Sequence, residues 1–149
     1  KGLGVLTLKG GLRLNSSEGF LIMEKKIAVR MGQSRFDVSW RITNESGKEV
    51  KAIWGSEWSF TFFDRERKEM GVRQVEVQDG WSPVFLRITG RDAFEYWQFP
   101  IETVARTEED FRLMHQGISV FPHWRLSLGP KKTFERSLTF HFSNGKDKN

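Results

Sequence analysis

Residues 34–43 read SRFDVSWRIT, in which apolar and polar side chains alternate along the chain. The side chains that share the apolar side are Phe36, Val38, Trp40 and Ile42. A period of two residues is typical of a strand with one buried face and one face in water. We therefore expect an antiparallel strand over these residues and not a helix.

Four further segments show the same alternation. Their apolar sets are Trp58, Phe60 and Phe62; Val84, Leu86 and Ile88; Ile118, Val120, Trp124, Leu126 and Leu128; and Leu138, Phe140 and Phe142. Turn-forming residues separate the runs at short intervals, for example at 44–47 and 79–80. Many short strands joined by turns predict an all-β, antiparallel β-sandwich, here with about ten strands. Pro122 predicts an edge strand or a bulge where it interrupts its run.

The composition bounds the domain organisation and excludes several kinds of chemistry. A chain of 149 residues fits one domain with a sizeable core, and we expect a single domain, 1–149, ending in a polar tail, 144–149. With no Cys, disulfides, thiolate metal sites and a Cys nucleophile are excluded. The three His residues lack the spacing of metal ligands, so we expect neither a metal nor a cofactor.

The charge pattern argues against nucleic acid as a partner. The net charge is +5 and the pI is about 9.7, but basic and acidic residues alternate, as in residues 64–69, DRERKE. Such alternation is typical of an ion-paired surface and not of a phosphate-binding track. No apolar run is long enough to span a bilayer, so we expect no membrane partner.

The first ten residues, KGLGVLTLKG, have neither an initiator Met nor the pattern of a signal peptide. We therefore expect a piece of a longer, cytoplasmic protein.

The aromatic residues, 13% of the chain, have two interpretations. Most of them follow strand parity and are expected to fill the space between two sheets. Trp81, Trp97 and Trp124 are instead candidate platforms that stack on the apolar face of a sugar. Core packing remains the alternative for each of them.

Polar candidates accompany these platforms. Glu57, within residues 54–60, WGSEWSF, would accept hydrogen bonds from sugar hydroxyls, or it is simply a charge on the polar face of a strand. His115 and Gln116 combine hydrogen-bonding side chains with Gly117, which permits close backbone approach. A plain turn is the alternative at that position.

Three segments together resemble a known family. They are residues 54–60, WGSEWSF; residues 99–108, FPIETVARTE; and residues 115–124, HQGISVFPHW. In order and spacing they resemble the C-terminal β-sandwich domain of family 57 glycoside hydrolases, which are α-amylase and 4-α-glucanotransferase enzymes. The resemblance covers roughly residues 20–142 and implies a sandwich of the galactose mutarotase type.

The resemblance also implies that catalysis takes place in another part of the protein. In that family the retaining chemistry belongs to an N-terminal catalytic barrel, so no catalytic residue is carried over to this chain. We expect a non-catalytic accessory domain that stabilises this barrel and contacts α-1,4-glucan. The candidate contacts are Trp54, Trp81, Trp97 and Trp124, with Glu57, His115 and Gln116 as hydrogen-bonding partners.

Two alternatives remain at this point. One is a purely structural docking module without sugar affinity, whose exposed apolar patch faces the barrel. The other is a stand-alone sugar-active enzyme of mutarotase type, which needs His115 or His123 to converge with Glu57 in a cleft.

Overall fold

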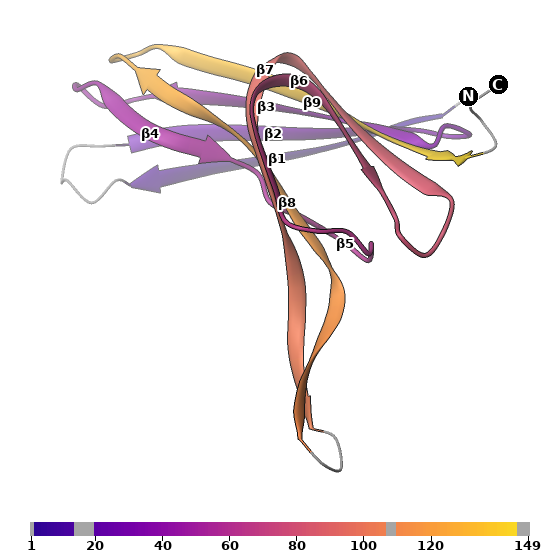
Figure 1. Ribbon diagram of the computed structural model, residues 1–149. Coiled ribbons are helices and arrows are strands. Elements are labelled where there is room, and N and C mark those ends of the chain that lie inside the picture. The colour runs from indigo at the N-terminus through magenta and orange to yellow at the C-terminus, as the bar shows by residue number, and fades with distance from the viewer. Residues whose placement is uncertain (1, 14–19, 107–109, 146–149) are drawn as a thin grey trace.

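The computed structural model describes residues 2–13, 20–106 and 110–145, which are almost entirely antiparallel strand. The strands are β1 (Leu3–Arg13), β2 (Phe20–Arg30), β3 (Arg35–Asn44), β4 (Val50–Gly55), β5 (Trp58–Phe60), β6 (Arg67–Gln78), β7 (Val84–Arg106), β8 (Phe111–Leu128) and β9 (Thr133–Asn144) (Figure 1). They are ordered β1-β2-β3-β9-β7-β8-β4, with β5 paired to β8 and β6 paired to β7. The described residues contain no helix that is long and apolar enough to cross a membrane.

A bend in the long strand β7 folds this single sheet into two layers. The residues of β7 up to Gly90 pair with β9, whereas those from Glu95 onward pair with β8. A Cβ atom on Gly90 would lie 2.7 Å from the carbonyl oxygen of Asp92 and 2.9 Å from the Phe94 ring, so the bend is too tight for a side chain. β6 bends alongside β7 through two register shifts, beside Gly71 with its φ of +65°.

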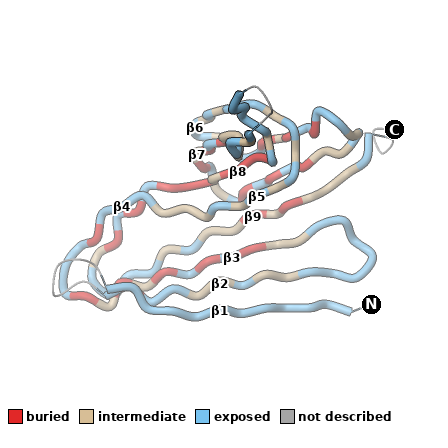
Figure 2. Tube along the Cα trace, turned by 90° about the horizontal axis from the view of Figure 1, so that it is seen from below, coloured by how far each residue is buried: buried red, intermediate tan, exposed pale blue. Residues whose placement is uncertain are grey.

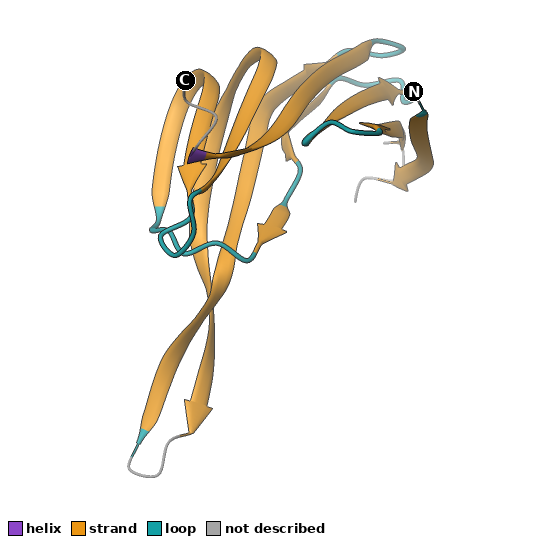
Figure 3. Ribbon diagram, turned by 90° about the vertical axis from the view of Figure 1, so that its right-hand side faces the viewer, coloured by secondary structure: helices purple, strands orange, loops and turns teal. Residues whose placement is uncertain are grey.

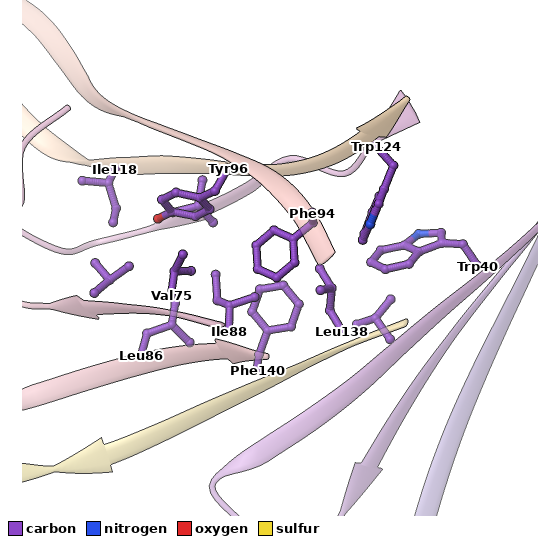
Figure 4. Close-up of a cluster of buried hydrophobic side chains, with 13 residues drawn as sticks. Trp40, Val75, Leu86, Ile88, Phe94, Tyr96, Ile118, Trp124, Leu138 and Phe140 are labelled. Carbon is purple, nitrogen blue, oxygen red and sulfur yellow. The ribbon is translucent and has the colours of Figure 1, made fainter. Parts of the chain in front are cut away.

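The core lies between the two layers and consists largely of residues from the predicted alternating runs (Figure 4). It also contains Val75 and Val77 of β6 and Phe94 and Tyr96 of β7, which those runs did not include. Its buried members include Val38, Trp40, Leu86, Ile88, Phe94, Tyr96, Ile118, Val120, Trp124, Leu138 and Phe140. The predicted all-β antiparallel sandwich is thus confirmed, with nine strands in the described part of the chain where about ten were expected. Phe62 packs against this core from beyond the end of β5, and not from within the strand.

A buried polar network fastens the segment that follows β5. The side chain of Gln98 has no exposed area; its Nε2 donates to Asp64 Oδ2 (2.9 Å) and to the carbonyl oxygen of Arg65 (2.6 Å). Its Oε1 accepts the hydroxyl of Tyr96 at 2.5 Å. Burial raises the pKa of Tyr96 far above its usual value, so this hydroxyl remains a donor.

Pro122 has a different surrounding from the one predicted. It lies in β8, a central strand flanked by β7 and by β4 and β5. Its carbonyl oxygen accepts the Ser56 amide (3.2 Å), in the gap where β4 has ended and β5 has not begun. In a strand, the nitrogen of a residue points to the same side as its carbonyl. The proline therefore needs neither an edge nor a bulge, because the strand beside it is interrupted where its missing N–H would have donated.

The two layers overlap only in part, and each extends beyond the other. In the first layer, β1 is exposed along its whole length, as Figure 2 shows in pale blue. In the second layer, the ends of β7 and β8 leave the body as a two-stranded arm, residues 102–106 and 111–114 (Figure 3). We call the core-facing side of β1 and β2 the β1–β2 inner face. Its exposed apolar side chains are Leu6, Leu8, Leu12, Met23 and Val29.

Candidate functional site

Two of the predicted tryptophan platforms belong to the core. The side chain of Trp124 is 4% exposed and stacks on Trp54, with ring centroids 5.7 Å apart and an angle of 18° between the planes. Trp40 packs against both rings, at 5.2 Å from Trp54 and 6.1 Å from Trp124. Figure 4 shows Trp40 beside Trp124. The interpretation of Trp124 as a stacking platform is therefore wrong, because neither face of its ring is accessible. Trp54 is half-buried, and its ring packs against those of Trp40 and Trp124.

Trp97 lies on the outer face of the second layer and is 38% exposed. Its ring meets His123 edge-on, with centroids 4.5 Å apart, while Phe121 stacks on the same imidazole at 5.1 Å, and the histidine is fully buried. His123 donates from Nδ1 to the carbonyl oxygen of Phe121 (3.0 Å), and its Nε2 lies 3.2 Å from Glu95 Oε2. The histidine and carboxylate that meet on this face are thus His123 and Glu95, with the imidazole closed off from solvent.

Glu57 lies on the same outer face, in the interruption between β4 and β5. Its Oε1 accepts the hydroxyl of Ser119 at 2.6 Å, and the carboxylate is otherwise exposed. Neither His115 nor His123 is among the hydrogen-bond or ion-pair partners of Glu57 in the described residues. The convergence that a mutarotase-type enzyme would need is therefore not formed.

His115 is carried to the opposite face by a β-bulge. β7 and β8 pair Ile101 with Gly117 and then Glu102 with His115, which leaves Gln116 as the extra residue. One additional residue reverses the side to which the following side chains point. Without the bulge His115 would lie on the outer face; with it, the imidazole points to the inner face.

On the inner face, His115 joins two other aromatic rings. Its Nε2 donates to the carbonyl oxygen of Phe62 (2.9 Å), and its ring lies 4.3 Å from that of Phe63. Phe63 in turn stacks on Trp81, with centroids 4.7 Å apart and 24° between the planes. We call Trp81, Phe63 and His115 the aromatic stack. Its outermost member, Trp81, is 80% exposed.

Asp79 holds the turn that carries Trp81. One carboxylate oxygen accepts the Phe63 amide (2.9 Å), and the other accepts both the amide (3.1 Å) and the hydroxyl (2.6 Å) of Ser82. The Gly80 amide donates to the carbonyl oxygen of Phe63 at 2.9 Å, so both backbone groups of Phe63 are fixed. The Ser82 hydroxyl, followed by the Phe63 amide, lowers the pKa of Asp79 and keeps it ionised at neutral pH.

The structure therefore separates the predicted site residues into two surface groups and the pair Trp54 and Trp124, whose rings pack in the core. Trp97 and Glu57 lie on the outer face, Trp81 and His115 lie in the aromatic stack, and Gln116 is exposed at the bulge. Sequence reasoning missed Phe63 and Asp79. Phe63 follows the Trp58, Phe60 and Phe62 series by one residue and so breaks its parity, which was the available signal.

A recessed polar region lies elsewhere, on the outer face of β2, β3 and β9. Its charged groups are paired with one another, as in Lys26–Glu24 (3.0 Å) and Arg41–Glu135 (2.7 Å). Lys9 and Lys26 together lower the pKa of Glu24 to about 2. None of the predicted site residues lies in this hollow.

The folded sheet places the chain in a fold class, the antiparallel sandwich of the galactose mutarotase type. A galactose mutarotase-related enzyme from Lactobacillus acidophilus superposes on 93% of this chain and 72% of its own, with a TM-score of 0.53 and 8% identity. Residues 6–138 match the family described as Alpha-amylase/4-alpha-glucanotransferase, C-terminal. The chain belongs to this family.

Relatives with known names agree with this assignment. The chain is 23% identical to an alpha-amylase from Pyrococcus furiosus over 119 residues, which are 80% of this chain and 18% of that protein. The crystal structure of a 4-alpha-glucanotransferase from Thermococcus litoralis superposes with a TM-score of 0.74 and 24% identity, over 92% of this chain and 20% of that chain. This chain thus spans about a fifth of the length of either protein.

Proposed function

We propose that this chain is the accessory C-terminal domain of an α-glucan-processing enzyme, and that it stabilises the catalytic part of its parent protein by packing against it. The family and the names of the relatives support the substrate class. The small share of each relative that the chain covers supports a catalytic part located elsewhere in the parent.

The observation that carries this proposal is the β1–β2 inner face. The exposed apolar side chains of this face, such as Leu6, Leu8 and Leu12, point to the same side of the sheet as the core, but the second layer does not cover them. The arm has a similar uncovered surface, with Val104, Phe111, Leu113 and Met114 exposed. Apolar patches of this extent usually mark an interaction surface, and a two-stranded ribbon alone is marginally stable in water. Both uncovered regions are therefore suited to contact with a protein surface.

The stand-alone mutarotase alternative receives less support. Catalysis of that type needs an accessible imidazole beside a carboxylate. His123 meets Glu95 but is fully buried, and His115 uses its Nε2–H for the carbonyl oxygen of Phe62. A polarimetric assay of glucose and galactose mutarotation with the purified chain tests this alternative, and we expect no acceleration above the buffer rate.

The docking role is tested by exchanging one side chain on each face of β1. Leu8 is 51% exposed on the inner face, and its neighbour Thr7 is exposed on the outer face. Leu8→Gln in the parent enzyme should lower the free energy of unfolding by about 1.5–3 kcal/mol, the value of one buried Leu side chain. Thr7→Gln is the matched control and should have little effect. In the isolated chain neither change should matter, because both side chains are exposed there. An unchanged stability of the parent with Leu8→Gln would contradict the docking role.

A further inference from the structure

We propose that the aromatic stack is a binding platform for α-1,4-glucan, separate from any catalytic centre, with Trp81 as the surface on which a pyranose ring stacks. The choice of α-glucan as ligand rests on the proposed function. The location and mode of binding rest on the geometry of the described residues.

Trp81 has no structural role that explains its position. It is 80% exposed, it belongs to neither core cluster, and among the described residues its ring contacts Phe63 alone. Six tryptophans occur in the chain, and Trp81 is the most exposed of them. A planar ring presented to solvent in this way offers the apolar surface that the CH-rich face of a pyranose covers.

The turn and the ring beneath Trp81 limit its freedom before any ligand arrives. Asp79 accepts three hydrogen bonds within this region, from Ser82 and from Phe63. The Gly80 amide closes the contact by donating to the carbonyl oxygen of Phe63. Binding to a preorganised surface loses less conformational entropy than binding to a mobile one.

Polar groups that could orient a bound sugar lie beside His115, at the end of the aromatic stack opposite Trp81. Because Nε2 of His115 donates to a carbonyl oxygen, the neutral ring has its acceptor at Nδ1. Glu102 pairs directly opposite His115, and Gln116 follows at the bulge, exposed to solvent. An apolar platform with a few convergent hydrogen-bonding groups is the composition of a sugar site. These groups would engage hydroxyls of the sugar unit next to the one on Trp81.

The bulge and Gly117 bring these parts together. A Cβ atom on Gly117 would overlap the carbonyl oxygen of Phe60 and lie 3.3 Å from the Cα of Thr61. The chain leaving β5 therefore runs in close contact with β8 at this residue. It continues to Phe63, whose ring contacts both His115 and Trp81.

The experiment is titration of the purified chain with maltoheptaose, followed by tryptophan fluorescence and calorimetry, for the native sequence and for Trp81→Ala. We expect saturable binding in the millimolar range and a roughly tenfold loss of affinity in Trp81→Ala, the effect of one aromatic contact of about 1.4 kcal/mol. Phe63→Leu should weaken binding as well, because it removes the ring that supports Trp81.

Trp97→Ala is the matched control, since Trp97 is an exposed tryptophan on the opposite face. Its affinity should stay within about twofold of the native value, below the size of an aromatic contact. The proposal is overturned by the absence of binding at millimolar maltoheptaose, by unchanged affinity in Trp81→Ala, or by equal affinity for cellohexaose. Such results would leave the docking role intact, because that role is measured by the stability of the parent and not by sugar binding.

Discussion

Replacing Trp124 with Ala should destabilise the chain more than removing any exposed tryptophan. Its ring is 4% exposed and packs against Trp54, Trp40 and Phe94, with centroid distances of 5.7, 6.1 and 6.2 Å. Truncation of a buried Trp to Ala costs about 3–5 kcal/mol, because apolar burial is lost and a cavity remains. This is a large part of the roughly 5–15 kcal/mol that stabilises a typical domain.

The assay is equilibrium unfolding in urea, monitored by circular dichroism, together with thermal unfolding. The expected loss corresponds to a fall in Tm on the order of 10 °C for a chain of this size. Trp81→Ala provides the comparison and should change the free energy of unfolding by less than about 0.5 kcal/mol, as is usual for exposed positions.

A second substitution separates packing from hydrogen bonding. The indole Nε1 of Trp124 is buried and has no hydrogen-bond partner among the described residues. Trp124→Phe leaves much of the ring packing in place and removes this unpaired donor, so it should cost less than about 2 kcal/mol. The reasoning is refuted if Trp124→Ala costs less than about 1 kcal/mol, or if Trp81→Ala proves equally destabilising.

Further predictions concern the region around the aromatic stack. Gly117→Ala should lower the free energy of unfolding by about 1–3 kcal/mol, because its Cβ would overlap the Phe60 carbonyl oxygen, whereas Gly47→Ala, with no atom near its Cβ, should be nearly neutral in the same urea titration. Asp79→Asn should destabilise the chain by about 1–3 kcal/mol at pH 7, because the amide nitrogen cannot accept the Ser82 hydrogen bonds. The pKa of Asp79 is lower in the folded chain than in the unfolded chain. The stability that ionised Asp79 contributes is therefore complete above the usual carboxyl pKa and is lost as the pH falls through the folded pKa. In urea titrations between pH 7 and pH 3, the difference in free energy of unfolding between Asp79→Asn and the native chain should shrink as the pH falls. Gln98→Leu should cost about 1–3 kcal/mol in the same assay, because it leaves the buried Tyr96 hydroxyl without its acceptor, and an unchanged midpoint would contradict the role given to this network.

Strand parity predicted the layers because it depends only on neighbouring residues. Phe36, Val38, Trp40 and Ile42 lie in β3 on the side facing the core, as the alternation of residues 34–43 indicated. Trp124 shares parity with Ile118 and Val120 and is buried with them. Of the two interpretations given for Trp124, core packing is the one that agrees with this signal.

The site depends on contacts that no local pattern contains. The extra residue Gln116 is recognisable only once β8 is aligned with β7, and it decides the face on which His115 lies. The hydrogen bond that the Phe63 amide donates to Asp79 Oδ1 joins residues sixteen apart in the sequence. Pro122 was misjudged for the same reason, because the interruption that accommodates it belongs to other strands, β4 and β5.

In the parent protein, we expect the catalytic part to cover the β1–β2 inner face. Amide hydrogen exchange measures this directly, by comparing peptides from β1 and from the arm in the isolated chain and in the parent enzyme. We expect fast exchange in the isolated chain, where β1 is exposed throughout, and marked protection of β1 in the parent. Equally fast exchange of β1 in both proteins would contradict it.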